Sequence, residues 1–135
     1  MFRKNLDKII AESLASYVRK LNDENFNGAI VVVEGLRDIR SLRSVGFSGN
    51  IFMFCHNNNL LSLVEESKKY RKVILLFDLD REGRSLTNKA VTILEGMRIS
   101  VDLYFRRELS STTRGKVKHV EELSRFKEYL EPFDE

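Results

Sequence analysis

The stretch ILLFDLDREGRS, residues 74–85, decides the fold of this chain. Its apolar half is typical of a strand that is covered on both faces, and the apolar run ends on Asp78 and Asp80. A glutamate, a glycine and two arginines follow directly. Because two carboxylates this close repel each other, their position at a strand end indicates a site where a cation neutralises them.

Strand and helix patterns alternate on both sides of this stretch. Apolar runs predict strands at AIVVVE (29–34), NIFMFC (50–55), KVILLFD (72–78) and ISVDLYF (99–105). Apolar residues at helical spacing predict helices at 36–46, about 59–70, about 82–97 and 120–132. This alternation predicts an α/β, Rossmann-like fold with a mostly parallel four-stranded sheet and helices on both faces.

Two segments lie outside this alternation. Residues 4–21 predict an amphipathic N-terminal helix, whose apolar stripe either covers one face of the sheet or pairs two subunits in a homodimer. Residues 108–118 read as a basic loop before the closing helix. We therefore expect an N-terminal helix and linker (1–27), a central domain (28–107) and a basic loop with a C-terminal helix packed on the same domain (108–135).

Composition limits the class of protein. A chain of 135 residues with 42% hydrophobic residues fits one domain with a core of its own. No apolar run approaches the ~20 residues that span a bilayer, and the N-terminus lacks the continuous apolar stretch of a signal peptide. The single cysteine, Cys55, is interpreted as a packed thiol and excludes an internal disulfide. We expect a cytoplasmic protein without a membrane partner; the net charge of +3 is compatible with a nucleic-acid partner.

A third acid belongs with the aspartate pair. Glu34 ends the strand 29–34, and ligands bind parallel sheets beyond the carboxyl ends of the strands. If this strand neighbours the strand 72–78, at ~4.8 Å, Glu34 faces Asp78 and Asp80. Such a set of oxygens suits Mg²⁺, with Mn²⁺ as a substitute. For one acid alone, capping of the next helix is the simpler interpretation, but the combination E-G-x-x-D and D-x-D-x-E-G favours a metal site.

The two motifs VVVEGLRD (31–38) and LLFDLDREG (75–83) resemble the Toprim domain of topoisomerases, primases, recombination mediators and several nucleases. The resemblance covers about residues 28–107, and the whole chain looks most like small stand-alone archaeal Toprim proteins. It implies that Glu34 is a general acid or base that also contacts metal, and that Asp78 and Asp80 hold Mg²⁺. It further implies that Glu82 is an additional metal ligand and that Asp38 has a supporting role.

The remaining candidates surround these acids. Guanidinium groups pair bidentately with phosphate, so basic residues near the acids are expected to contact a nucleic-acid backbone: Arg37, Arg81, Arg84, Arg114 and Lys116. Gly35 and Gly83 are expected to let the chain pass close to an ion or backbone. The two histidines, His56 and His119, lack metal-ligand spacing, and a surface or capping role is favoured for both.

These observations favour an enzyme over a non-catalytic binding protein. The chain is too short for a complete topoisomerase or primase, which need further domains. We expect a Mg²⁺-dependent Toprim nuclease, a hydrolase of phosphodiesters in RNA or DNA with RNA slightly favoured. The alternative is a metal-binding nucleic-acid adaptor without catalysis, in a repair, recombination or RNA-processing complex. A phosphatase of the haloacid-dehalogenase type is disfavoured, because its D-x-D follows the first strand rather than the third.

Overall fold

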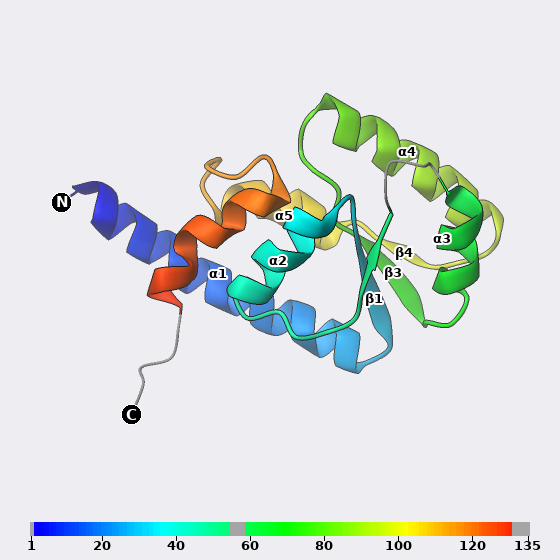
Figure 1. Ribbon diagram of the computed structural model, residues 1–135, viewed down its shortest axis with the longest axis horizontal. Helices are drawn as coiled ribbons and strands as arrows, with labels where there is room; N and C mark the ends of the chain where they lie inside the picture. The colour runs from blue at the N-terminus through cyan, green and yellow to red at the C-terminus, as the bar shows by residue number, and fades with distance from the viewer. Residues whose placement is uncertain (1, 55–58, 131–135) are drawn as a thin grey trace.

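The computed structural model describes residues 2–54 and 59–130, with the side chains from residue 5 on (Figure 1). Cys55 and His56 therefore lie outside the described residues. The elements follow in the order α1 (Phe2–Phe26), β1 (Ala29–Val33), α2 (Leu36–Ser44), β2 (Ile51–Met53), α3 (Leu60–Ser67), β3 (Lys72–Leu75), α4 (Arg81–Gly96), β4 (Val101–Asp102), α5 (Tyr104–Thr112) and the 3₁₀ helix η1 (Val120–Tyr129). None of the helices in these ranges is both long and apolar enough to cross a membrane.

The four strands form one sheet in the order β2-β1-β3-β4, and every pair is parallel. The predicted fold class is thus confirmed, and β1 and β3 are neighbours, with Val32 opposite Leu75. The chain leaves β1 toward β2 on one side and leaves β3 toward β4 on the other. The carboxyl ends of β1 and β3 therefore flank the point where the strand order reverses, which is where open α/β sheets bind ligands.

Helices cover both faces of the sheet because the side chains of β1 alternate between two apolar clusters. Val31 and Val33 join the cluster formed with α1, α2, α5 and η1, whereas Ile30 and Val32 join the cluster formed with α3 and α4. All five residues of β1 are buried. This continuous apolar run is what a strand covered on both faces requires.

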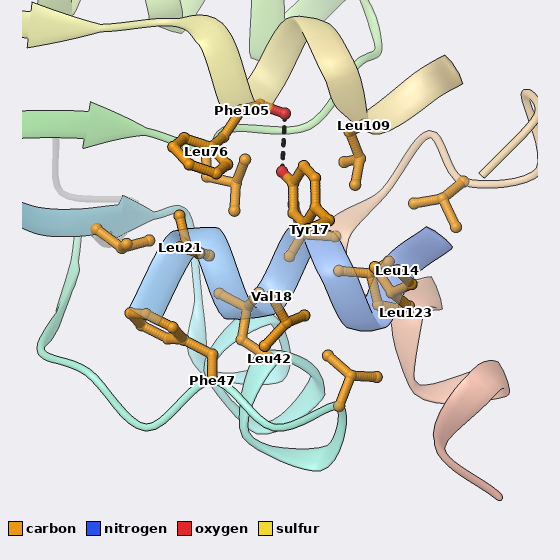
Figure 2. Packing of buried hydrophobic residues seen from close by; sticks show 14 of the residues in the cluster. Leu14, Tyr17, Val18, Leu21, Leu42, Phe47, Leu76, Phe105, Leu109 and Leu123 are labelled. Carbon is orange, nitrogen blue, oxygen red and sulfur yellow. Dashed lines mark hydrogen bonds between the residues drawn. The ribbon is translucent and has the colours of Figure 1, made fainter. Parts of the chain in front are cut away.

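Helix α1 lies across one face of the sheet, so its apolar stripe has a partner within the chain (Figure 1). Figure 2 shows Leu14, Val18 and Leu21 of this helix among side chains from the other elements of the cluster. The Tyr17 hydroxyl donates a buried hydrogen bond of 2.7 Å to the carbonyl oxygen of Phe105. Of the two roles predicted for this helix, covering the sheet is the one that the structure shows.

The segment after β4 differs from its prediction. Only Val101–Asp102 forms the fourth strand, and residues 104–112 are α-helical instead of continuing the strand into a loop. The Asp102 carboxylate accepts a hydrogen bond of 2.7 Å from the Tyr104 amide, which turns the chain out of the sheet. Phe105 and Leu109 then lie one helical turn apart, and both are buried. The closing helix, predicted at 120–132, is a 3₁₀ helix rather than an α-helix.

Candidate metal centre

Glu34 and Asp78 meet where β1 and β3 end. The Leu76 amide donates to the Val32 carbonyl at 2.9 Å, and two residues further along each chain the Asp78 amide donates to Glu34 Oε2 at 2.8 Å. In a regular parallel sheet, the Asp78 amide would donate its hydrogen bond to a backbone carbonyl of the neighbouring strand. Here it donates to the carboxylate of Glu34 instead. The contact fixes Glu34 beside Asp78 and leaves its other oxygen outside this hydrogen bond.

Asp78 is held from three directions. Its Oδ1 accepts a hydrogen bond of 2.7 Å from the amide of Val120, at the start of η1. Its carbonyl oxygen accepts from Arg106 Nη2 at 2.7 Å, and Arg106 Nε donates to the Phe77 carbonyl at 3.1 Å. The site therefore depends on α5 and on the segment before η1, as well as on the two strand ends.

Asp80 is a helix cap as well as a site residue. The strand predicted at 72–78 ends at Leu75, so Asp78 and Asp80 both lie beyond β3. Asp80 Oδ1 accepts from the Gly83 amide at 2.7 Å and caps α4, while Oδ2 lies 3.2 Å from His119 Nε2. The capping interpretation of an acid after a strand therefore holds for Asp80, and its second oxygen faces the candidate site.

Gly83 packs directly on the turn that carries Asp78. A Cβ atom at this position would lie 1.9 Å from the Asp78 carbonyl oxygen, which no side chain tolerates without a backbone shift. The requirement is a close approach, because the backbone of Gly83 does not have a positive φ. Gly35, by contrast, would meet no atom within 4 Å.

His119, for which a surface or capping role was favoured, is the N-cap residue of η1, and it also lies beside the two aspartates. Asp78, Asp80 and His119 each offer one ligand atom, and these atoms all lie within 4.8 Å of one another. The turn that presents His119 is fixed by Glu122, whose Oε1 accepts from the amides of Lys118 and His119, each at 2.9 Å. No local sequence motif predicts that His119 lies beside Asp80, because 39 positions separate the two residues in the sequence.

The site raises the pKa of Glu34 and of Asp78. Burial, followed by the charges of Glu34 and Asp38, raises the pKa of Asp78 to about 6, although the hydrogen bond from Val120 opposes this. The pKa of Glu34 is also raised, first by burial and then by the charges of neighbouring acids, against the hydrogen bond from the Asp78 amide. Carboxylates that are disfavoured in this way are relieved by a divalent cation.

Asp38 supports the loop after β1. It is buried, with 6% of its surface exposed, and its Oδ2 accepts a hydrogen bond of 3.1 Å from the Gly35 amide. Burial raises its pKa as well, and the charge of Glu121 adds to the shift. The interaction ties the start of α2 to the residue that follows Glu34.

The arginines and lysines predicted at the site are distributed around it. Arg37 and Arg40 line an open pocket of about 450 Å³ that Glu34 and Asp78 also line. Glu82 lines a second opening of about 300 Å³ with Glu34 and Lys89.

Of the other predicted basic residues, three are exposed to solvent and one forms an ion pair within the chain. Arg81 and Arg84 are exposed in the first turn of α4, and Arg114 is exposed beyond α5. Lys116 is only partly exposed, and its amine lies 3.8 Å from the Asp7 carboxylate of α1. Its role in binding an external anion therefore competes with an internal ion pair.

Comparison with protein families matches residues 29–123 to the Toprim domain, so the chain belongs to the Toprim family. Among its relatives are the UPF0292 proteins of Archaeoglobus fulgidus, 35% identical over 84% of this chain and 88% of that protein, and of Thermococcus gammatolerans, 39% identical over 78% and 77%. At these identities and coverages the chain is a member of the UPF0292 proteins. A solved structure of a protein from Aquifex aeolicus has a TM-score of 0.70 and 28% identity, and covers 81% of this chain and 96% of that one.

The donor set fits the divalent metal that a Toprim domain implies. Glu34 and Asp78 each use one carboxylate oxygen for a backbone amide and keep a second oxygen available for a cation. Oxygen donors in partly buried surroundings suit a hard cation that retains water ligands. The neighbouring pocket of about 450 Å³ offers room for those waters and for a phosphate group.

Proposed function

We propose that this protein is a metal-dependent phosphodiesterase, a small nuclease that uses Mg²⁺ and prefers RNA slightly over DNA. The observation that carries the proposal is the contact between Glu34 and Asp78 at the reversal point of the sheet, beside a pocket that two arginines also line. A phosphodiester needs a cation for its charge, an acid or base for a proton, and cationic side chains for adjacent phosphates. This edge of the sheet brings all three kinds of group together.

The residues divide these tasks. Asp78 and Asp80 hold the cation, with Glu34 and Glu82 as further ligands, directly or through water. When bound, Mg²⁺ neutralises charge on the phosphate and on the leaving oxygen. Glu34 transfers the proton, because it lies beside Asp78 and lines the pocket that would hold the phosphate.

Two adjoining pockets are suited to bind consecutive phosphates of a nucleic-acid strand. The pocket beside Glu34 adjoins a groove of about 320 Å³ between α2 and η1, and Arg37, Arg40 and Glu121 line both. Lys127 lines the far part of the groove. A phosphate at the metal thus has cationic side chains beside it for the next phosphates of the strand, with Arg81 and Arg84 on the α4 side. Recognition of this kind is independent of base sequence.

A cleavage panel tests the proposal. Structured RNA, single-stranded RNA, and single- and double-stranded DNA are incubated with the protein in Mg²⁺, in Mn²⁺ and in EDTA. We expect metal-dependent cleavage that Glu34→Gln and Asp78→Asn each reduce by at least a hundredfold. Glu95→Gln, an exposed acid at the far end of α4, is the matched control and should retain activity.

Two outcomes oppose the proposal. Cleavage that persists in EDTA or in Asp78→Asn would identify a contaminating nuclease. Tight binding of nucleic acid without turnover on every substrate, in either metal, would overturn the nuclease and identify a non-catalytic adaptor.

A further inference from the structure

The segment before η1 completes the metal centre from a part of the chain far from both motifs. Lys118 accepts a hydrogen bond of 2.6 Å from the Leu79 amide through its carbonyl oxygen, and the Val120 amide donates to Asp78. His119 lies between these two contacts, so its backbone is fixed against the loop that carries both aspartates. Its imidazole is 45% exposed and reaches Asp80 from the solvent side.

The separation of the donor atoms suits a shared ion. For bonds of about 2.1 Å in an octahedral site, neighbouring ligand atoms lie about 3.0 Å apart and opposite ones about 4.2 Å. His119 Nε2 lies 3.2 Å from Asp80 Oδ2, and the donor atoms of Asp78, Asp80 and His119 span at most 4.8 Å. One cation can therefore contact all three with small side-chain movements.

A carboxylate also lies near the second nitrogen of the imidazole. Its other ring nitrogen, Nδ1, lies 3.7 Å from Glu122 Oε1, the same oxygen that accepts from the amides of Lys118 and His119. A hydrogen bond from the second nitrogen to a carboxylate is the usual arrangement around a histidine that binds metal, and Glu122 lies just beyond that distance.

We propose that His119 is an inner-sphere nitrogen ligand, and that it makes the centre selective for first-row transition ions such as Mn²⁺ and Co²⁺ over Mg²⁺. The inference deepens the proposed function and rests on its metal site. Carboxylate oxygens alone suit Mg²⁺, whereas an imidazole contributes little to Mg²⁺ binding and much to that of transition ions.

Pulsed EPR of bound Mn²⁺ tests the ligand directly on the full chain. We expect nitrogen coupling from a coordinated imidazole in the wild type and its loss in His119→Gln, which replaces the nitrogen with an amide oxygen. Bound Mn²⁺ without nitrogen coupling in the wild type would overturn the role of His119 while leaving the carboxylate site intact. Absence of Mn²⁺ binding would overturn both the inference and the metal site on which it rests.

Calorimetric titration with Co²⁺ and Mg²⁺ tests the selectivity. In His119→Gln the Co²⁺ Kd should rise at least about tenfold and the Mg²⁺ Kd much less, so the preference falls. Lys118→Ala is the matched control: it removes an exposed charge from the same turn and should leave the ratio of the two Kd values unchanged. An equal change for both ions in His119→Gln would contradict the selectivity, whatever the cleavage panel shows.

Discussion

At the residue scale, the site is an arrangement of short contacts around one turn. Asp78 contacts Glu34 through its amide, Val120 through its carboxylate and Arg106 through its carbonyl oxygen. Gly83 lies against the same carbonyl and lets the helix that Asp80 caps begin there. The D-x-D-x-E-G motif is thus a packing requirement as well as the proposed ligand set.

Gly83→Ala should distort this turn. The added Cβ would lie 1.9 Å from the Asp78 carbonyl oxygen, so the backbone of the site must move, and we expect a loss of about 1–3 kcal/mol in the free energy of unfolding. Urea denaturation measures it. Gly96→Ala is the matched control in the same helix, since no atom lies within 4 Å of its added Cβ. Equal stability of the two variants would contradict the packing argument.

At the element scale, α1 and α5 support the site from one face of the sheet. α5 provides Arg106, whose guanidinium group binds the carbonyl oxygens of Phe77 and Asp78. α1 packs against α5, and the Tyr17 hydroxyl joins the two helices (Figure 2). Helix α1 therefore supports the candidate metal centre indirectly, because it holds α5 in place and α5 carries Arg106.

Tyr17→Phe should weaken this connection. The change leaves the buried carbonyl oxygen of Phe105 without the hydroxyl donor, at a cost of about 1–3 kcal/mol in the free energy of unfolding. Tyr104→Phe, at a tyrosine that is 43% exposed, is the control and should change stability by less than about 0.5 kcal/mol. Chemical denaturation of both variants gives the comparison, and a Tyr17→Phe variant as stable as wild type would argue against the coupling.

The sequence predicts these elements unequally, for physical reasons. Strands β1 and β3 are long apolar runs covered on both faces, so their pattern is unambiguous, and the acids that follow them fall at one sheet edge. Tyr104 and Phe105 favour a strand by local propensity, but Asp102 turns the chain and tertiary packing makes the segment helical. His119 reaches Asp80 only through the path of α5 and η1, which no local pattern encodes.

At the scale of the whole molecule, basic side chains line the openings beside the carboxyl ends of the strands. The candidate metal centre lies at the carboxyl edge of the sheet. Arg37 and Arg40 line one opening beside it, and Lys89 lines another. Arg71 directly precedes β3, at the opposite end of this strand from the openings, and its side chain is exposed. Backbone phosphates are thus expected to contact one edge of the molecule.

This arrangement predicts the salt dependence of nucleic-acid binding. Loss of one phosphate contact in Arg40→Ala should reduce the slope of log K against log salt by about 0.7–0.9. Arg71→Ala is the control, since it removes the same charge from the other end of the sheet. Fluorescence anisotropy at several salt concentrations measures both slopes. Equal slopes for the two variants would contradict a path through the groove between α2 and η1.

The ends of β1 and β3 are proposed to form a divalent metal centre, and calorimetric titration of the full chain with Mn²⁺ is the decisive measurement. We expect saturable binding to the wild type and to the control Asp23→Asn, an exposed aspartate of α1. Asp78→Asn should lose this binding, with at least about a tenfold rise in Kd. Equal Mn²⁺ affinity in Asp78→Asn and in the wild type would rule out a metal centre at these strand ends.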